Sequence, residues 1–181
     1  SLTLQAQYRS PSGDWADNYL SDLSFTNSGI WDTNFRPGIS AELGDYDIRI
    51  MVNDTDGGST GWIYDYGDIF EVTNNVAIIG DYSTSSSFVL RSSTIVLGFN
   101  SSDIEDSENQ LTLTASYRSP SGDWSEAYLS TLWYNNAQNH WETNFTPPAS
   151  AVLGDYDLRI MVNDTDSGSS GWSTYSDVIS V

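Results

Sequence analysis

Short runs of alternating apolar and polar residues recur along the chain, and they predict β-strands. In residues 2–8, the side chains of Leu2, Leu4, Ala6 and Tyr8 share one face, and Thr and Gln occupy the other. A period of two with one apolar face is typical of a half-buried antiparallel strand. The same alternation occupies three further runs, at residues 46–53, 111–117 and 156–163. Turn-forming segments separate the runs and helical periodicity is not convincing anywhere, so the chain is predicted to be all-β.

A long internal repeat organises these runs into modules. The sequence RSPSGDW at 9–15 returns unchanged at 118–124, and the sequence at 44–56 returns at 154–166 with one change. The offset of about 109 residues suits a whole β-sandwich domain better than a solenoid unit. Residues 73–110 have no counterpart ahead of the first copy. We therefore expect a complete module at 73–181 and a module at 1–72 that lacks its opening strands.

The alternation also predicts which side chains of the repeated strand point into a core. They are Tyr46, Ile48, Ile50 and Val52 in the first copy and Tyr156, Leu158, Ile160 and Val162 in the second.

The repeated block LGDYDIRIMVNDTD resembles the late strands of immunoglobulin-like and PKD-like modules. In these modules a Gly-x-Tyr sequence enters a β-rich strand that ends in an Asx/Gly turn, and Tyr46 and Tyr156 match the position of a tyrosine corner. Cysteine is absent, which excludes a disulfide-linked antibody-type domain. Tandem acidic modules without cysteine are similar to those of archaeal and bacterial S-layer and filament proteins. The resemblance implies two tandem immunoglobulin-like antiparallel β-sandwich modules at a cell surface or outside the cell.

Negative charge dominates the composition. Six Arg and no Lys stand against 25 carboxylates, which gives a net charge of -19. Such a surface repels nucleic acid and anionic headgroups, and no apolar run approaches the roughly 20 residues that span a bilayer. We therefore expect neither nucleic-acid binding nor membrane insertion in this segment. A divalent-cation binder, a protein of a salty habitat and a soluble surface without a special partner all remain open.

Signatures of catalysis are missing from the sequence. The single histidine, His140, has no counterpart in the first copy and is expected in an exposed turn. Neither a Gly-x-Ser-x-Gly elbow nor a cysteine nucleophile occurs, and the many carboxylates single out no catalytic pair. We expect a protein that is not an enzyme and has no catalytic residues.

Calcium is the ligand that the acidic segments favour most, because hard cations bind several oxygen atoms on flexible loops. The loops at 53–58 and 163–168 carry Asn and Asp at alternate positions, and a third acidic turn lies at 103–106. The alternative is that these turns satisfy their own backbone groups, since the closing Glu of an EF-hand is missing. The candidate ligands are Asp54, Asp56, Asp103, Asp106, Asp164 and Asp166.

Asn-x-Ser/Thr sequons and tryptophans are the remaining candidate surface features. The sequons are candidate glycosylation sites and lie at Asn53, Asn100, Asn144 and Asn163. The pairs Trp15/Trp124, Trp31/Trp141 and Trp62/Trp172 recur in both copies, so we expect them in the cores rather than on a carbohydrate platform. Trp133 replaces Ser24 of the first copy, and we expect it to face outward as a ligand-facing aromatic.

The favoured function is a non-catalytic extracellular module of a surface layer, fibre or adhesin. The alternative is a carbohydrate-binding or adhesion module of a secreted enzyme. The expected partners are other copies of the chain, neighbouring modules of a longer chain, or glycans. Three explanations of the shorter first module stay open: a longer polypeptide, a strand donated by another molecule, or an intact smaller fold.

Overall fold

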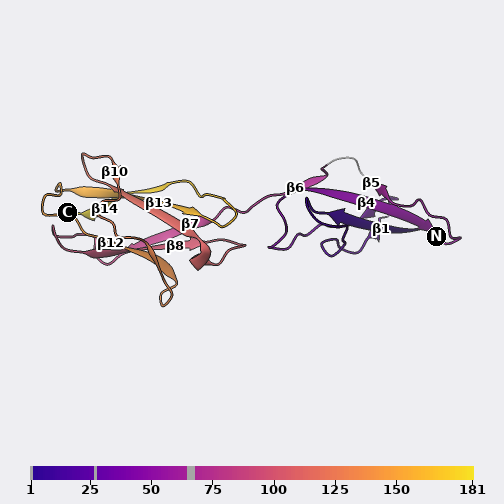
Figure 1. Ribbon diagram of the computed structural model, residues 1–181, viewed down its shortest axis with the longest axis horizontal. Helices are drawn as coiled ribbons and strands as arrows, with labels where there is room; N and C mark the ends of the chain where they lie inside the picture. Colours follow the sequence, from indigo (N-terminus) through magenta and orange to yellow (C-terminus); the bar gives the residue numbers. More distant parts are fainter. Residues whose placement is uncertain (1, 27, 65–67) are drawn as a thin grey trace. The chain divides into compact units, whose positions relative to one another are not determined.

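The computed structural model describes residues 2–26, 28–64 and 68–181. It confirms the all-β prediction, because the described elements are fourteen strands and one short 3₁₀ helix. Every pair of named strands is antiparallel. In the described part of the chain, no helix is long and apolar enough to cross a bilayer. The chain divides into unit 1, Ser1–Asn74, and unit 2, Asn75–Val181 (Figure 1).

Unit 2 is a sandwich of two four-stranded sheets, which appear as two layers in Figure 1. One sheet has the order β11-β12-β8-β7 and the other has the order β10-β9-β13-β14. This is the strand arrangement of an immunoglobulin-like sandwich, in which the opening strands β7 and β8 share a sheet with the later strands β11 and β12. The strands are β7 (Ile78–Thr84), β8 (Ile95–Ser102), β9 (Thr112–Arg118), β10 (Trp124–Ser125), β11 (Trp133–Asn135), β12 (His140–Phe145), β13 (Asp155–Asn163) and β14 (Ser173–Ser180), and the 3₁₀ helix η1 is Glu108–Gln110.

The core of unit 2 lies between its two sheets. From β13, Tyr156, Leu158, Ile160 and Val162 are all fully buried, as the alternation predicts. The opposite sheet supplies the facing apolar side chains of β8 and Phe145 of β12. Burial of apolar surface on both inner faces is the main stabilising contribution in such a sandwich.

Unit 1 contains one larger sheet and one small ribbon. In the larger sheet β4 pairs with β1, β5 and β6, and the ribbon is β2-β3. β1 and β4 pair in the register of their counterparts, so Ala6 lies opposite Ile50 as Ala115 lies opposite Ile160. The strands are β1 (Leu2–Arg9), β2 (Ser24–Phe25), β3 (Trp31–Asp32), β4 (Gly44–Asp54), β5 (Ile63–Tyr64) and β6 (Phe70–Val72).

Burial in unit 1 differs from the prediction. Among its described apolar residues only Tyr8 and Tyr46 are buried, whereas Ile50 is 37% exposed. Ile48 and Val52 are half-buried. The predicted core position is therefore right for Tyr46 and wrong for Ile50, because the described residues of unit 1 include no equivalent of β7 and β8 over this face.

A tyrosine corner closes the same end of both units. The Tyr46 hydroxyl donates to the carbonyl of Glu42, and the Tyr156 hydroxyl donates to the carbonyl of Val152, each at 2.8 Å. Burial is the main cause that raises the pKa of both phenols. In unit 1 this end is also held by ring contacts among five aromatic side chains: Tyr8, Tyr19, Phe35, Tyr46 and Phe70.

Candidate functional site

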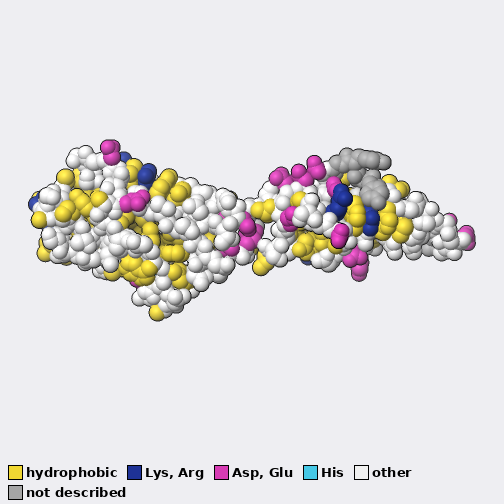
Figure 2. All heavy atoms as spheres, in the orientation of Figure 1, with side chains coloured by type: hydrophobic (Ala, Val, Ile, Leu, Met, Phe, Trp, Pro, Cys, Tyr) yellow, Lys and Arg dark blue, Asp and Glu magenta, His cyan; other side chains and the backbone are white. Residues whose placement is uncertain are grey.

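A ladder of stacked Arg and Trp side chains occupies the outer face of the β1-β4 sheet in unit 1. The Arg49 guanidinium carbon lies 4.5 Å from the ring centroid of Trp15 and 4.2 Å from that of Trp62. Arg9 covers Trp15 at 5.0 Å. Arg9, Trp15 and Arg49 come from the two repeated sequence blocks, and Trp62 follows the second block. The two arginines lie on β1 and β4 at positions that alternate with the inward side chains. Figure 2 shows hydrophobic side chains gathered around arginines on the visible face of this unit.

The same ladder recurs on the β9-β13 sheet of unit 2. Arg159 lies 4.6 Å from the ring centroid of Trp124 and 4.1 Å from that of Trp172. Arg118 covers Trp124 at 5.0 Å. Each cation–π contact stabilises by about 0.5–1 kcal/mol when exposed and by up to about 2 kcal/mol when desolvated. The ladders therefore hold the segments that carry the tryptophans against the outer face of each sheet.

An ion pair continues each ladder. The Nε atom of Arg9 donates to Asp47, and that of Arg118 donates to Asp157, both at 3.1 Å. Asp157 also accepts a hydrogen bond from the amide of Asp177 at 3.1 Å. The hydrogen bond from Arg118 is the main cause that lowers the pKa of Asp157, and the Asp177 amide adds to it.

One contact distinguishes the two ladders. In unit 1, Arg49 Nε donates to the side-chain oxygen of Gln7 at 2.9 Å. Ser116 takes the place of Gln7 in unit 2. There the Nε atom of Arg159 is buried without a hydrogen-bond partner.

The expected core position of the repeated tryptophans is correct for Trp141 and wrong for Trp15, Trp62, Trp124 and Trp172, while Trp31 contacts the exposed ring of Phe25 and lines an open groove. Trp141 packs against the core of unit 2, and its indole donates to the carbonyl of Glu108 at 3.1 Å. The ladder tryptophans instead lie on the outer face, where Trp172 is 40% exposed. They lie outside the core because each indole ring packs on an outward-pointing Arg of the neighbouring strand. The sequence repeat does not distinguish this role from core packing. These ladder residues are Trp15, Trp62, Trp124 and Trp172.

The two predicted calcium loops use their first Asp to close a turn. Asp54 Oδ1 accepts hydrogen bonds from the amides of Asp56 and Gly58 at 2.9 and 2.7 Å. Asp164 Oδ1 accepts equivalent bonds from Asp166 and Gly168, which lie at 3.0 and 2.6 Å. In the described parts of the chain, no three His, Cys, Asp or Glu side chains converge as a metal site.

The acidic turn at 103–106 has two carboxylate oxygens without protein partners. Asp103 Oδ1 accepts from the amides of Glu105 and Asp106, but Asp103 Oδ2 and Glu105 Oε2 are buried and unpaired. Glu105 Oε1 accepts from the Asn75 amide group at 2.7 Å. Burial raises the pKa of Asp103, but hydrogen bonds from the Glu105 and Asp106 amides bring it below its usual value. Asp106 accepts from the amide and hydroxyl of Thr165, which joins this turn to the second loop.

Glu105 lies in the predicted acidic turn but was not among its candidate ligands, and the contact with Thr165 was not predicted. The alternating Asp-x-Glu spacing of the turn could have indicated Glu105. The approach of Thr165, by contrast, depends on the ends of β8 and β13 meeting, which no local pattern reveals.

The four sequons lie at different depths. Asn100 is exposed on β8, whereas Asn53, Asn144 and Asn163 are half-buried in strands. The exposed side chain of Asn100 is therefore the sequon most open to a modifying enzyme, and glycosylation stays a prediction at all four.

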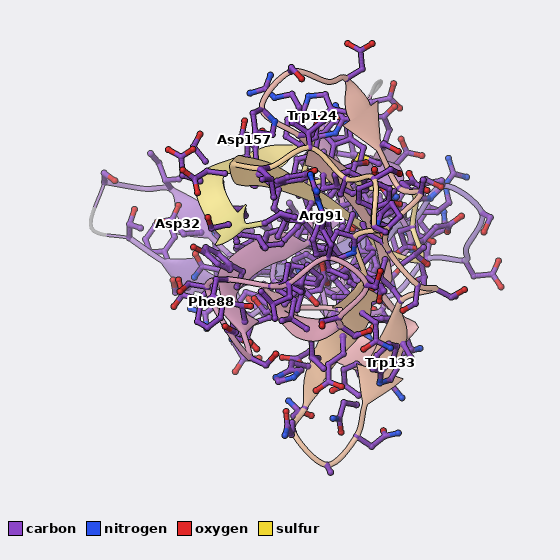
Figure 3. The ribbon with its side chains drawn as sticks, turned by 90° about the vertical axis from the view of Figure 1, so that its left-hand side faces the viewer. Asp32, Phe88, Arg91, Trp124, Trp133 and Asp157 are labelled. Atoms are coloured by element: carbon purple, nitrogen blue, oxygen red, sulfur yellow. The ribbon has the colours of Figure 1, made fainter. Side chains whose placement is uncertain are left out.

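Trp133 lies in a polar cluster that unit 1 does not repeat. It is 37% exposed and pairs with Glu142 across β11 and β12. Glu142 accepts hydrogen bonds from the Asn135 amide group and from His140, both at 2.9 Å, and these in that order lower its pKa. His140 is a half-buried strand residue and not the expected exposed turn residue, because it begins β12. Figure 3 shows Trp133 and Trp124 on opposite sides of unit 2.

An open groove lies beside the edge of β1 in unit 1 and beside the N-terminal half of β9, which β10 leaves unpaired, in unit 2. The groove volumes are about 680 Å³ and 520 Å³. Corresponding residues line both grooves, including Leu4, Leu20 and Trp31 in unit 1 and Leu113, Leu129 and Trp141 in unit 2. The groove is thus a property of the repeated module.

Comparison with known proteins identifies no relative, since no family model and no curated protein matches the chain.

Proposed function

We propose that this chain is a non-catalytic structural module of an extracellular surface layer, fibre or adhesin. One observation supports this most: the chemically distinctive residues of the repeated blocks have partners inside their own unit. Arg49 stacks between tryptophans, Tyr46 closes the corner, and Asp54 closes its turn. Their counterparts in unit 2 make the same contacts. Residues that recur to hold a fold together are what a repeated structural module needs.

The cell-surface assignment rests on composition and on the resemblance to PKD-like and immunoglobulin-like modules of archaeal and bacterial envelopes. A net charge of -19 suits a soluble, exposed surface that repels other acidic molecules. The chain has no cysteine, so its modules fold without disulfides. Brief protease treatment of intact source cells tests this proposal. We expect peptides from both units in the released fraction, whereas recovery only after cell lysis would contradict it.

Carbohydrate binding is a second candidate function, and the cluster around Trp133 favours it. An indole 37% exposed beside hydrogen-bonding Glu142 and Asn135 offers both a stacking face and polar groups for a sugar. A glycan array with the wild-type chain and Trp133→Ala tests this function. The matched control is Phe88→Ala, which removes another exposed aromatic side chain of unit 2, one that is 65% exposed. Saturable binding that Trp133→Ala abolishes and Phe88→Ala retains would support this function, and an array without binding would leave the structural role.

Calcium would add to the scaffold at the acidic turn of unit 2. We propose Asp103 and Glu105 as its side-chain ligands, because each has a buried oxygen without a protein partner. Two carboxylates fit part of a calcium coordination shell, which accepts backbone carbonyls and water as well. The carboxylates of Asp54 and Asp164 already accept hydrogen bonds from their own turns.

A further inference from the structure

Beyond the buried rings of Tyr8 and Tyr46, the inner face of the β1-β4 sheet is apolar but uncovered, whereas the same face is covered in unit 2. Leu2 is 57% exposed and its counterpart Leu111 is 2% exposed. Ile50 is 37% exposed and its counterpart Ile160 is 0% exposed. Because the pairing register of the two sheets is the same, the difference comes from what lies over the face.

In unit 2 the covering layer is the β7-β8 hairpin together with β12. β8 presents Ile95, Leu97 and Phe99 to the core, with exposures of 6%, 0% and 1%. It is also paired in full along β12, from Phe99 opposite Trp141 to Ile95 opposite Phe145. One hairpin thus supplies both the apolar cover and the hydrogen-bonding partner of β12.

Unit 1 keeps the strand that would receive such a hairpin. Residues 31–35 correspond to 141–145 of unit 2 and retain Trp31, Thr33 and Phe35. In the described residues, β3 pairs with β2 alone and is two residues long, whereas β12 is six residues long. An unpaired strand edge beside an apolar face is a site for strand addition.

We propose that the inner face of unit 1 is the docking site of a two-stranded β-hairpin of the β7-β8 type. The hairpin is supplied in cis, by polypeptide joined to the N-terminal side of Leu2. Its inner strand pairs antiparallel with residues 31–35 and places three large apolar side chains over Leu2, Leu4 and Ile50.

The internal repeat identifies the occupant and its direction of entry. In unit 2 the hairpin comes immediately before β9, and residues 103–111 lead from β8 into that strand. β1 is the counterpart of β9 and begins within one residue of the equivalent position. A hairpin joined ahead of Leu2 therefore reaches the open face by the connection that unit 2 already uses.

The test adds a second copy of residues 75–110 to the full chain, with Gln110 of the added copy joined to Leu2. We expect a monomer in which the amides of β4 exchange hydrogen at least tenfold more slowly than in the unfused chain. The matched control carries Leu97→Asp and Phe99→Asp in the added copy only. This control should leave β4 exchange unchanged, and unit 2 serves as the internal reference in every variant.

A disulfide measures the register independently, because the natural chain has no cysteine. β8 and β12 pair Val96 with Asn144, and Asn34 is the counterpart of Asn144. Asn34→Cys should therefore cross-link with Val96→Cys of the added copy under mild oxidation. The shifted pair, Asn34→Cys with Leu97→Cys, should cross-link much less.

Three results would overturn the proposal. The first is unchanged β4 exchange in a fusion that also fails to cross-link. The second is equal cross-linking by the two cysteine pairs. The third is concentration-dependent self-association of the unfused chain that protects β4 by itself, since this would assign the face to a second copy.

Discussion

Units 1 and 2 have nearly the same sequence along their central strands, yet only unit 2 buries the inner face of that strand along its whole length. β4 and β13 differ at one position in nine over the shared stretch 45–53 and 155–163. Nevertheless Val162 and Ile160 are 0% exposed while Ile50 is 37% exposed. The comparison teaches that alternation determines which face of a strand is apolar, whereas burial depends on a second sheet.

The features that the units share explain why unit 1 can keep its local structure. Its tyrosine corner, aromatic cluster and Arg–Trp ladder involve residues on β1, β4 and β6 and on the segments that flank these strands, all within unit 1. These contacts hold the outer face and one end of the sheet. The rest of the inner face, around Leu2 and Ile50, is where the units diverge.

The largest expected difference is in the stability that each unit loses when the matching isoleucine of its central strand is replaced by alanine. Ile160→Ala should destabilise unit 2 by about 2–5 kcal/mol, because it leaves a cavity in a packed core. Ile50→Ala should cost unit 1 less than about 1 kcal/mol, since its side chain already contacts solvent. Denaturant unfolding followed by hydrogen-exchange mass spectrometry, which assigns each transition to a unit, measures both. Equal losses would mean that unit 1 has a core like that of unit 2.

Calcium should widen the difference in thermal stability between the units. A saturating ion at one hundred times its Kd stabilises the native state by about 2.7 kcal/mol. We expect added calcium to raise the melting temperature of unit 2 and a chelator to reverse it, with no effect on unit 1. Asp103→Asn with Glu105→Gln should abolish the increase, and Asp54→Asn should not. An unchanged melting curve would count against every candidate calcium ligand in the chain.

A smaller difference in stability between the units should be reduced by exchanging the residue beside the ladder Arg. Ser116→Gln gives Arg159 the partner that Gln7 gives Arg49, and we expect a gain of about 1 kcal/mol in unit 2. The reverse change, Gln7→Ser, should cost unit 1 a similar amount. Calorimetry of both variants measures the effect, and Ser116→Ala serves as the control without a new acceptor. A Gln variant no more stable than the Ala variant would contradict the pairing.

Acid should have a still smaller, directional effect on unit 2 through Asp157. Its pKa is lowered in the folded state, so its stabilising contribution is complete above the unfolded pKa of about 3.9. The contribution is lost as the pH falls through the lower folded value. Asp157→Asn should therefore destabilise unit 2 at pH 7 and reduce the slope of melting temperature against pH below about 4. An unchanged slope in this variant would mean that the Arg118–Asp157 ion pair does not contribute to the pH dependence of stability.

Much of the fold follows from sequence because its signals are local or repeated. The alternation in 156–163 identifies the inward residues of β13, and the repeat reveals that residues 73–110 lack a counterpart. The exposure of Ile50 could not be read from its own strand, because it depends on strands far away in the sequence. Over residues 45–53 and 155–163, β4 and β13 have the same alternation of apolar and polar residues.

The site residues were harder to predict because side-chain partners come from distant segments. The repeated tryptophans looked like core residues, yet Trp15 and Trp62 flank Arg49 on the outer face. Sequence repetition shows that a residue has the same role twice without showing which role it has. Likewise, His140 lies in a strand and contacts Glu142, a pairing that depends on the extent of β12.

Hydrogen exchange of the two matched strands in the unmodified chain tests the central claim most directly. β4 and β13 have almost the same sequence, so their intrinsic exchange rates are closely similar and differences report protection. We expect the amides of β13 to exchange at least one hundredfold more slowly than the corresponding amides of β4. Equal protection of the two strands in a monomeric chain would contradict an open inner face in unit 1.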